Sequence, residues 1–111
     1  MSFQSFALPE FWKCYESLPA NVRVLADAKF ALFQSEPFHP SLALKQKGEV
    51  WTADIGRSYR AIAYREGNDF HWFWIGTHEA YNNLLPRFAL GRAFFWQRAQ
   101  RMLGRYAAEV T

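Results

Sequence analysis

The chain has 111 residues, of which 50% are apolar and 19% aromatic, and its formal net charge is +3. This length is typical of a single domain, and the apolar fraction is sufficient for a hydrophobic core. One cysteine excludes an internal disulfide, and the sequence shows neither a secretion signal nor a run near the ~20 apolar residues of a membrane span, so we expect a soluble cytoplasmic protein.

The positive charge is concentrated in the last quarter of the sequence. Residues 1–85 carry eight basic and nine acidic side chains, whereas residues 86–111 carry five arginines and one glutamate. We therefore expect a nearly neutral globular part, residues 1–85, followed by a basic extension, residues 86–111.

Two helices are predicted near the N-terminus. Apolar side chains recur at helical spacing from Phe11 to Leu18, with Pro9 in the first turn and Pro19 as the stop. Asn21 is the predicted N-cap of a second helix. Its apolar side chains fall on one arc: Val22, Leu25, Ala26, Phe30, Leu32 and Phe33. The two helices would form a hairpin with one apolar side.

A small antiparallel sheet is predicted next. Residues 35–48 contain two prolines and are predicted to form a loop. Three strands follow, joined by short connections that contain glycine: residues 49–55, 59–65 and 70–77. The third is apolar on both faces, with Trp72 and Trp74 on one and Phe73 and Ile75 on the other, which indicates a central strand covered on both sides. The segment "SFQSF" near the N-terminus can add a weak first strand.

The C-terminal extension is predicted to be a long amphipathic helix that begins after Pro86. Its apolar side chains lie together on one arc: Phe88, Phe95, Ala99, Met102, Leu103 and Tyr106. Its arginines lie on another: Arg87, Arg98, Arg101 and Arg105. The overall prediction is an α+β fold, with two N-terminal helices packed on a small twisted antiparallel sheet and an additional C-terminal helix.

Several kinds of site lack support in the sequence. Three histidines and Cys14 show no paired metal-ligand spacing, so we predict no metal site. No glycine-rich phosphate loop occurs, and the serines and the cysteine have no recognisable nucleophile setting. We expect no cofactor.

Cationic and proton-transferring side chains gather on the predicted sheet instead. They are Lys45 and Lys47 before its first strand, Arg57 in the following hairpin, Arg60 at the start of the second strand, and His78 and Tyr81 after the third. In an antiparallel meander the end of the third strand returns beside the first hairpin. His78 can therefore approach Arg60, although the two are 18 positions apart.

Each of these side chains also has a structural interpretation. Arg60 projects from an otherwise apolar face and needs an anion, which could be a carboxylate of its own chain or a ligand phosphate. His78 could belong to a helix start, with Thr77 as the cap and Glu79 in the first turn. Lys45 and Lys47 could lie in a solvated loop.

The order of these segments resembles the RelE/ParE superfamily of small bacterial toxins. The similarity spans about residues 3–85 and rests on "FWKCYESLP", "HPSLALKQKGEVW", "IGRSYRAIAY" and "WFWIGTHEAYNNLL". It implies two helices packed on a twisted antiparallel sheet. It also implies the toxin of a type II toxin–antitoxin system, neutralised by a cognate antitoxin and acting by metal-independent cleavage of messenger RNA, usually on the ribosome.

The resemblance also implies roles for individual residues. RNA cleavage by attack of a 2′-hydroxyl needs a base, a cation near the phosphate and an acid. By position, Arg60 would stabilise the phosphate, His78 would be the acid or base, and Tyr81 would orient the substrate or stack on a base. Lys45 and Lys47 match a region in which some members place catalytic or RNA-contacting lysines, and we predict that they and Arg57 bind the substrate.

Two alternatives remain open at this stage. Members that poison DNA gyrase share the fold without ribonuclease chemistry, and a degenerate member could bind its antitoxin without any activity. Because residues 1–85 are nearly neutral, we expect this part of the chain to have little general affinity for RNA. The arginine-rich extension could supply that charge, dock an acidic partner or simply pack on the sheet.

Overall fold

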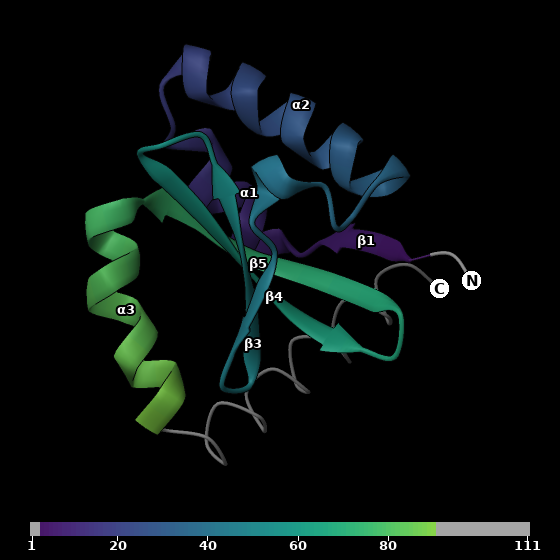
Figure 1. Ribbon diagram of the computed structural model, residues 1–111. Coiled ribbons are helices and arrows are strands. Elements are labelled where there is room, and N and C mark those ends of the chain that lie inside the picture. Colours follow the sequence, from purple (N-terminus) through teal and green to yellow (C-terminus); the bar gives the residue numbers. More distant parts are fainter. Residues whose placement is uncertain (1–2, 91–111) are drawn as a thin grey trace.

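A computed structural model of the chain describes residues 3–90, with side chains up to Pro86, and it has the predicted α+β fold (Figure 1). Five strands form one sheet in the order β1-β5-β4-β3-β2. The elements are β1 (Gln4–Ala7), α1 (Pro9–Glu16), α2 (Ala20–Ser35), a 3₁₀ turn η1 (Pro40–Leu42), β2 (Lys45–Lys47), β3 (Val50–Ile55), β4 (Tyr59–Glu66), β5 (Asp69–Thr77) and α3 (His78–Leu90). The described strands pair antiparallel except β1, which runs parallel to β5.

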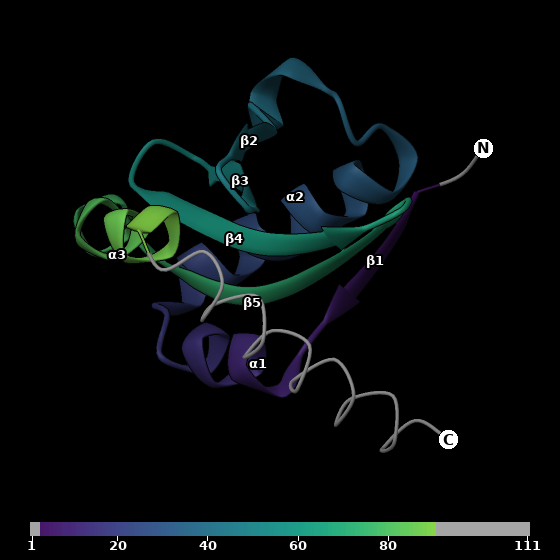
Figure 2. The same cartoon turned by 90° about the horizontal axis from the view of Figure 1, so that it is seen from below.

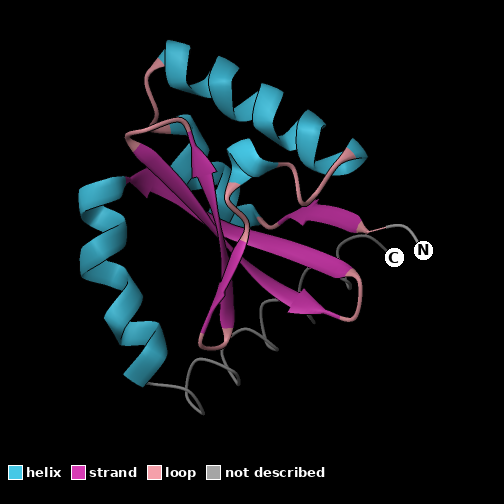
Figure 3. Ribbon diagram, in the orientation of Figure 1, coloured by secondary structure: helices cyan, strands magenta, loops and turns pink. Residues whose placement is uncertain are grey.

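The helical hairpin α1–α2 covers one face of the sheet (Figure 3). Pro9 occupies the first turn of α1, as predicted, because its missing N–H would have no intrahelical partner there. The predicted cap at Asn21 is wrong: the N-cap is Pro19, two residues earlier, so α2 begins at Ala20 and Asn21 lies within its first turn. Phe11, Ala26 and Phe33 bury their side chains almost completely in this first core.

Helix α3 covers the opposite face of the sheet (Figure 2). Ile62 and Phe73 of the sheet pack with Tyr81 of α3 in a second core, and Leu84 and Leu85 lie against it. This face, which we call the α3 face, carries most of the residues singled out from the sequence. The prediction that the last strand is covered on both sides is confirmed.

A β-bulge in β5 changes which side chains share a face. Ile62 pairs with Trp74 and Ala63 pairs with Trp72, so Phe73 has no partner of its own in the ladder. An extra residue reverses the alternation beyond it. Trp72 therefore packs against the helical hairpin and Trp74 against the α3 face, and the prediction that they share a side is wrong.

Two other segments differ from the sequence-based interpretation. Residues 35–48 are not entirely a loop, because they contain η1 and the short edge strand β2. The final helix begins at His78 rather than after Pro86 and continues through that proline to Leu90, across the predicted boundary at residues 85 and 86. The remainder of the predicted arginine-rich helix lies outside the described residues. Among residues 3–90, no helix is long and apolar enough to cross a membrane.

Candidate functional site

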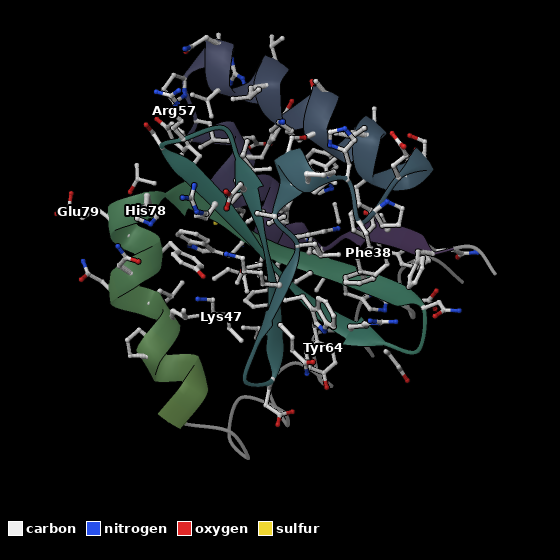
Figure 4. The ribbon with its side chains drawn as sticks, in the orientation of Figure 1. Phe38, Lys47, Arg57, Tyr64, His78 and Glu79 are labelled. Carbon is white, nitrogen blue, oxygen red and sulfur yellow. The ribbon has the colours of Figure 1, made fainter. Side chains whose placement is uncertain are left out.

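The β3–β4 turn and the start of α3 meet at one end of the sheet. Tyr59 pairs with Thr77 and Arg60 with Gly76 across β4 and β5. The backbone N–H of His78 donates to the carbonyl of Ser58 over 2.8 Å. The predicted return of the third strand beside the first hairpin is thus confirmed, and Figure 4 shows His78 at the start of α3 and Arg57 in the turn.

The β3–β4 turn depends on the conformation of Gly56 and on hydrogen bonds from Arg60. Gly56 has a φ of +69°, and a Cβ atom there would lie 2.7 Å from the side chain of Leu25 on α2. The positive φ favours glycine at this position, whereas the nearby atom is the end of the exposed Leu25 side chain, which can move aside. Arg57, the next residue, is exposed.

Arg60 is held by its own chain. Its Nε lies 3.0 Å from a carboxylate oxygen of Asp54, the residue opposite it on β3. Its Nη1 donates to the carbonyls of Gly56, Arg57 and Tyr59 over 3.3, 3.3 and 2.8 Å. The Arg60 side chain is only 17% exposed. Its guanidinium bridges the carbonyls of the β3–β4 turn and forms an ion pair with Asp54.

His78 and Tyr81 form a stacked pair at the start of α3. Their ring centroids are 6.1 Å apart with an interplanar angle of 18°. His78 is exposed, whereas Tyr81 is 6% exposed and belongs to the second core. Tyr81 therefore presents little ring surface for stacking on an RNA base but provides a rigid wall for the imidazole.

The helix-cap interpretation of this segment also describes the structure. The hydroxyl of Thr77 accepts a hydrogen bond from the backbone N–H of Ala80 over 3.1 Å, which satisfies one donor at the start of α3. Glu79 lies in the first turn, near the positive end of the helix dipole. Because Thr77 performs the capping, His78 is free of that role.

Lys45 and Lys47 lie on the same face of the sheet as Arg60. Lys45 pairs with Thr52 and Lys47 with Val50, and residues directly opposite each other in antiparallel strands project to the same side. Both lysines are exposed on the edge strand β2. They stand apart from His78 and the β3–β4 turn, which lie near the other end of β3, as Figure 4 shows for Lys47.

Two further residues on this face were missed by sequence reasoning. Asp54 neutralises Arg60, and the signal was present, because Asp54 and Arg60 are placed symmetrically about the β3–β4 turn. Tyr64 is buried, and burial, followed by the charges of Glu49 and Glu66, raises the pKa of its phenol to about 12. Because Tyr64 follows Arg60 and Ile62 at every second position of β4, the sequence could have predicted that it lies on the α3 face. The raised pKa could not have been predicted in this way.

Residues 22–83 match the family model of the ParE-like toxin domain, which is more than half of the chain. The chain belongs to the ParE-like toxin family. The matched region of the toxin contains all six residues singled out from the sequence, from Lys45 to Tyr81. It begins inside α2, so β1 and α1 lie outside it. No curated protein sequence matches the toxin.

Solved structures share the fold of this toxin at low sequence identity. The archaeal RelE–RelB complex from Pyrococcus horikoshii is 14% identical, covers 69% of this chain and 96% of its own, and has a TM-score of 0.58. The RelBE2 toxin–antitoxin complex from Mycobacterium tuberculosis is 13% identical, covers 70% of this chain and 100% of its own, and has a TM-score of 0.55. An Escherichia coli RelE variant in the free state is 17% identical, covers 78% of this chain and 98% of its own, and has a TM-score of 0.56. These values confirm the RelE-like fold, and together with the family match they confirm the resemblance found in the sequence.

No three metal-ligating side chains gather anywhere in the described part of the toxin. What the α3 face offers chemically is one exposed imidazole, a guanidinium in the neighbouring turn and two lysines further along the sheet. Such groups can transfer protons and attract a phosphate.

Proposed function

We propose that this toxin cleaves messenger RNA on the ribosome without a metal, and that a cognate antitoxin neutralises it. The observation that carries the proposal is the position of His78. It is an exposed imidazole whose backbone is tied to Ser58, whose ring is stacked on Tyr81, and which lies beside the turn that presents Arg57. A general acid or base must be held in this way to act on a bound substrate.

The reaction requires two proton transfers. The 2′-oxygen of a ribose attacks the adjacent phosphorus, its proton passes to a base, and the bond from phosphorus to the 5′-oxygen breaks as that oxygen takes a proton from an acid. The products are a 2′,3′-cyclic phosphate and a 5′-hydroxyl. We assign one of the two transfers to His78. Tyr81 serves as the positioning residue that fixes the plane of the imidazole.

Cations stabilise the charge that develops on the phosphate. Arg57 is an exposed guanidinium in the turn beside this site, and Lys45 and Lys47 lie further along the sheet, where they can hold the RNA backbone on either side of the cleaved bond. Arg60 contributes through Nη2, since Asp54 and the turn carbonyls engage Nε and Nη1. Its first task in this scheme is to position the turn.

The proposal is tested by inducing the toxin in growing bacteria and mapping the 5′ ends of message fragments. We expect growth arrest with cuts at ribosomal positions. His78→Ala should reduce cleavage by about 100-fold or more, the usual contribution of a general acid or base. Glu79→Ala, which changes the exposed neighbour, is the matched control and should remain toxic. Messages left whole during growth arrest would exclude RNA cleavage.

A second function is favoured by the ion pair between Arg60 and Asp54, because it engages the Arg60 charge that the first function would direct at a phosphate. The toxin could inhibit DNA gyrase, or bind its antitoxin without catalysis, using the same fold. Supercoiling assays with purified gyrase separate these cases from the first. Inhibition that persists in His78→Ala would support the gyrase function, because that function needs no proton transfer at this position.

A further inference from the structure

The outer edge of the sheet at β1 borders a groove that the proposed reaction does not use. This cavity of about 390 Å³ opens between β1, α1 and α2. Phe11, Trp12 and Phe30 contribute aromatic walls, and Trp12 is 47% exposed. Among the described residues that line the groove, Asp27 is the one charged side chain. The groove therefore combines an apolar interior with a negative rim.

The backbone of β1 presents hydrogen-bonding groups along this groove. The N–H groups of Gln4 and Leu8 donate to the carbonyls of Asn68 and Trp72 over 3.0 and 2.9 Å. Successive backbone groups of a strand point to opposite sides, so those of Ser5 and Ala7 point away from β5. Within residues 3–90, no strand pairs with this edge of the sheet. Figure 2 shows β1 at the edge, leading into α1.

The two edges of the sheet differ in how they are protected. The β2 edge carries Lys45 and Lys47, and exposed lysines are a common means of discouraging a further strand from pairing. The β1 edge, "QSFA", carries no charge and no proline. It is thus the edge that is chemically able to accept another strand.

Side chains of an added strand would meet the groove. Ser5 and Ala7 both line it, and a strand paired with β1 would place every second side chain on that same face. The hydroxyl of Tyr15 donates to Oδ1 of Asp27 over 2.8 Å, which orients the carboxylate and leaves Oδ2 to accept from a cation. The same hydrogen bond is the main reason why the pKa of Tyr15 is raised.

We propose that β1 binds an extended segment of a partner protein as a sixth strand. One apolar side chain of this segment enters the groove, and a basic side chain two positions away pairs with Asp27. Main-chain hydrogen bonds to Ser5 and Ala7 give affinity, and the two side chains give specificity. The surface lies on the helical-hairpin side of the sheet, opposite the α3 face, so the proposal does not depend on RNA cleavage.

The probe is the capped synthetic peptide Thr-Leu-Thr-Arg-Thr, titrated into the full-length, ¹⁵N-labelled toxin. Its leucine and arginine are two positions apart and share a face. We expect saturable binding, with the largest amide shifts at Ser5 and Ala7. Two further peptides carry backbone N-methyl groups, one on the leucine and arginine and the other on the threonines. In a paired strand only alternate N–H groups bond to β1, so one N-methyl peptide should bind at least tenfold more weakly and the other almost normally.

Variants of the toxin test the groove and the carboxylate. Ala31→Trp fills the groove from α2 and should weaken binding about tenfold, whereas Ala28→Trp, at an exposed position of the same helix outside the groove, should not. Asp27→Asn should weaken binding of the arginine peptide about tenfold. It should hardly change binding of an analogue in which glutamine replaces the arginine. Binding that is equal for both N-methyl peptides, shifts centred on Lys45–Lys47, or no saturation at millimolar peptide would each overturn the proposal.

Discussion

Arg60 and Asp54 face each other across β3 and β4 at the base of the turn that carries Arg57. Removing one partner of a partly buried pair leaves the other without compensation, and Arg60 also serves three turn carbonyls. We therefore expect Arg60→Ala to lower the free energy of unfolding by about 1–3 kcal/mol. Solvent weakens the ion pair because Asp54 is 36% exposed, so the lower part of this range is expected. Loss of toxicity in this variant alone would not reveal a contact with phosphate.

A double-mutant cycle separates the two roles of Arg60. Asp54→Asn, Arg60→Ala and the double variant are compared by urea denaturation, and we expect a coupling energy of about 1 kcal/mol. Cleavage is measured in the same set. If Arg60 contacts phosphate, Asp54→Asn should retain activity because it releases the guanidinium. A coupling energy near zero would mean that the pair contributes nothing to stability.

His71 gives the toxin a pH-dependent contribution to stability. Its ring stacks on Phe6 with centroids 5.2 Å apart, and its Nδ1 is buried without a hydrogen-bond partner among the described residues. Burial lowers the pKa of this imidazole from 6.5, although the charges of Asp69 and Glu66 oppose the shift. The folded state therefore favours the neutral ring.

The sign of the pH effect follows from this lowered pKa. Below pH 6.5 the unfolded chain binds a proton at His71 more readily than the folded chain, so the stabilisation present above pH 6.5 is lost as the pH falls through the folded pKa. We expect the free energy of unfolding to fall between pH 7.5 and 5.5, measured by urea denaturation, and His71→Phe to flatten that dependence. An unchanged slope in the variant would contradict this origin.

Local sequence patterns correctly predicted the helices and strands whose formation depends on residues close in sequence. The two helices, the three strands of the meander and the cap at Thr77 follow from side-chain periodicity and turn chemistry, and the meander alone placed His78 beside the β3–β4 turn. The burial of Tyr81 could also have been predicted, since it lies on one helical arc with Leu84 and Leu85.

Two features that sequence reasoning missed depend on how strands pair with one another. The parallel partnership of β1 with β5 joins residues more than 60 positions apart, and no local pattern encodes it. The bulge at Phe73 is a backbone event that leaves the composition of β5 unchanged, so a strict alternation assigned Trp74 to the wrong face. Asn21 has the right chemistry for a cap but lies two positions after the N-cap that the backbone uses.

At the scale of the whole molecule, charge separates the toxin into two parts. Residues 1–90 carry nine basic and nine acidic side chains, whereas residues 91–111 carry four arginines and one glutamate. Affinity for RNA rises with the number of phosphates neutralised and falls with salt accordingly. If the arginines of the C-terminal segment contact RNA, they supply most of the electrostatic attraction to the ribosome.

Truncation after Leu90 tests this contribution while keeping the described part of α3, which a cut at residue 85 would shorten. We expect the truncated toxin to bind a single-stranded RNA more weakly, with a slope of log K against log salt smaller by about 2–3 if all four arginines contact phosphate. A full-length variant with Arg98, Arg101 and Arg105 changed to Gln keeps the chain length and should reproduce most of that change. Equal slopes for all three proteins would mean that these arginines bind something other than RNA, and binding of an acidic peptide would then be measured with the same variants.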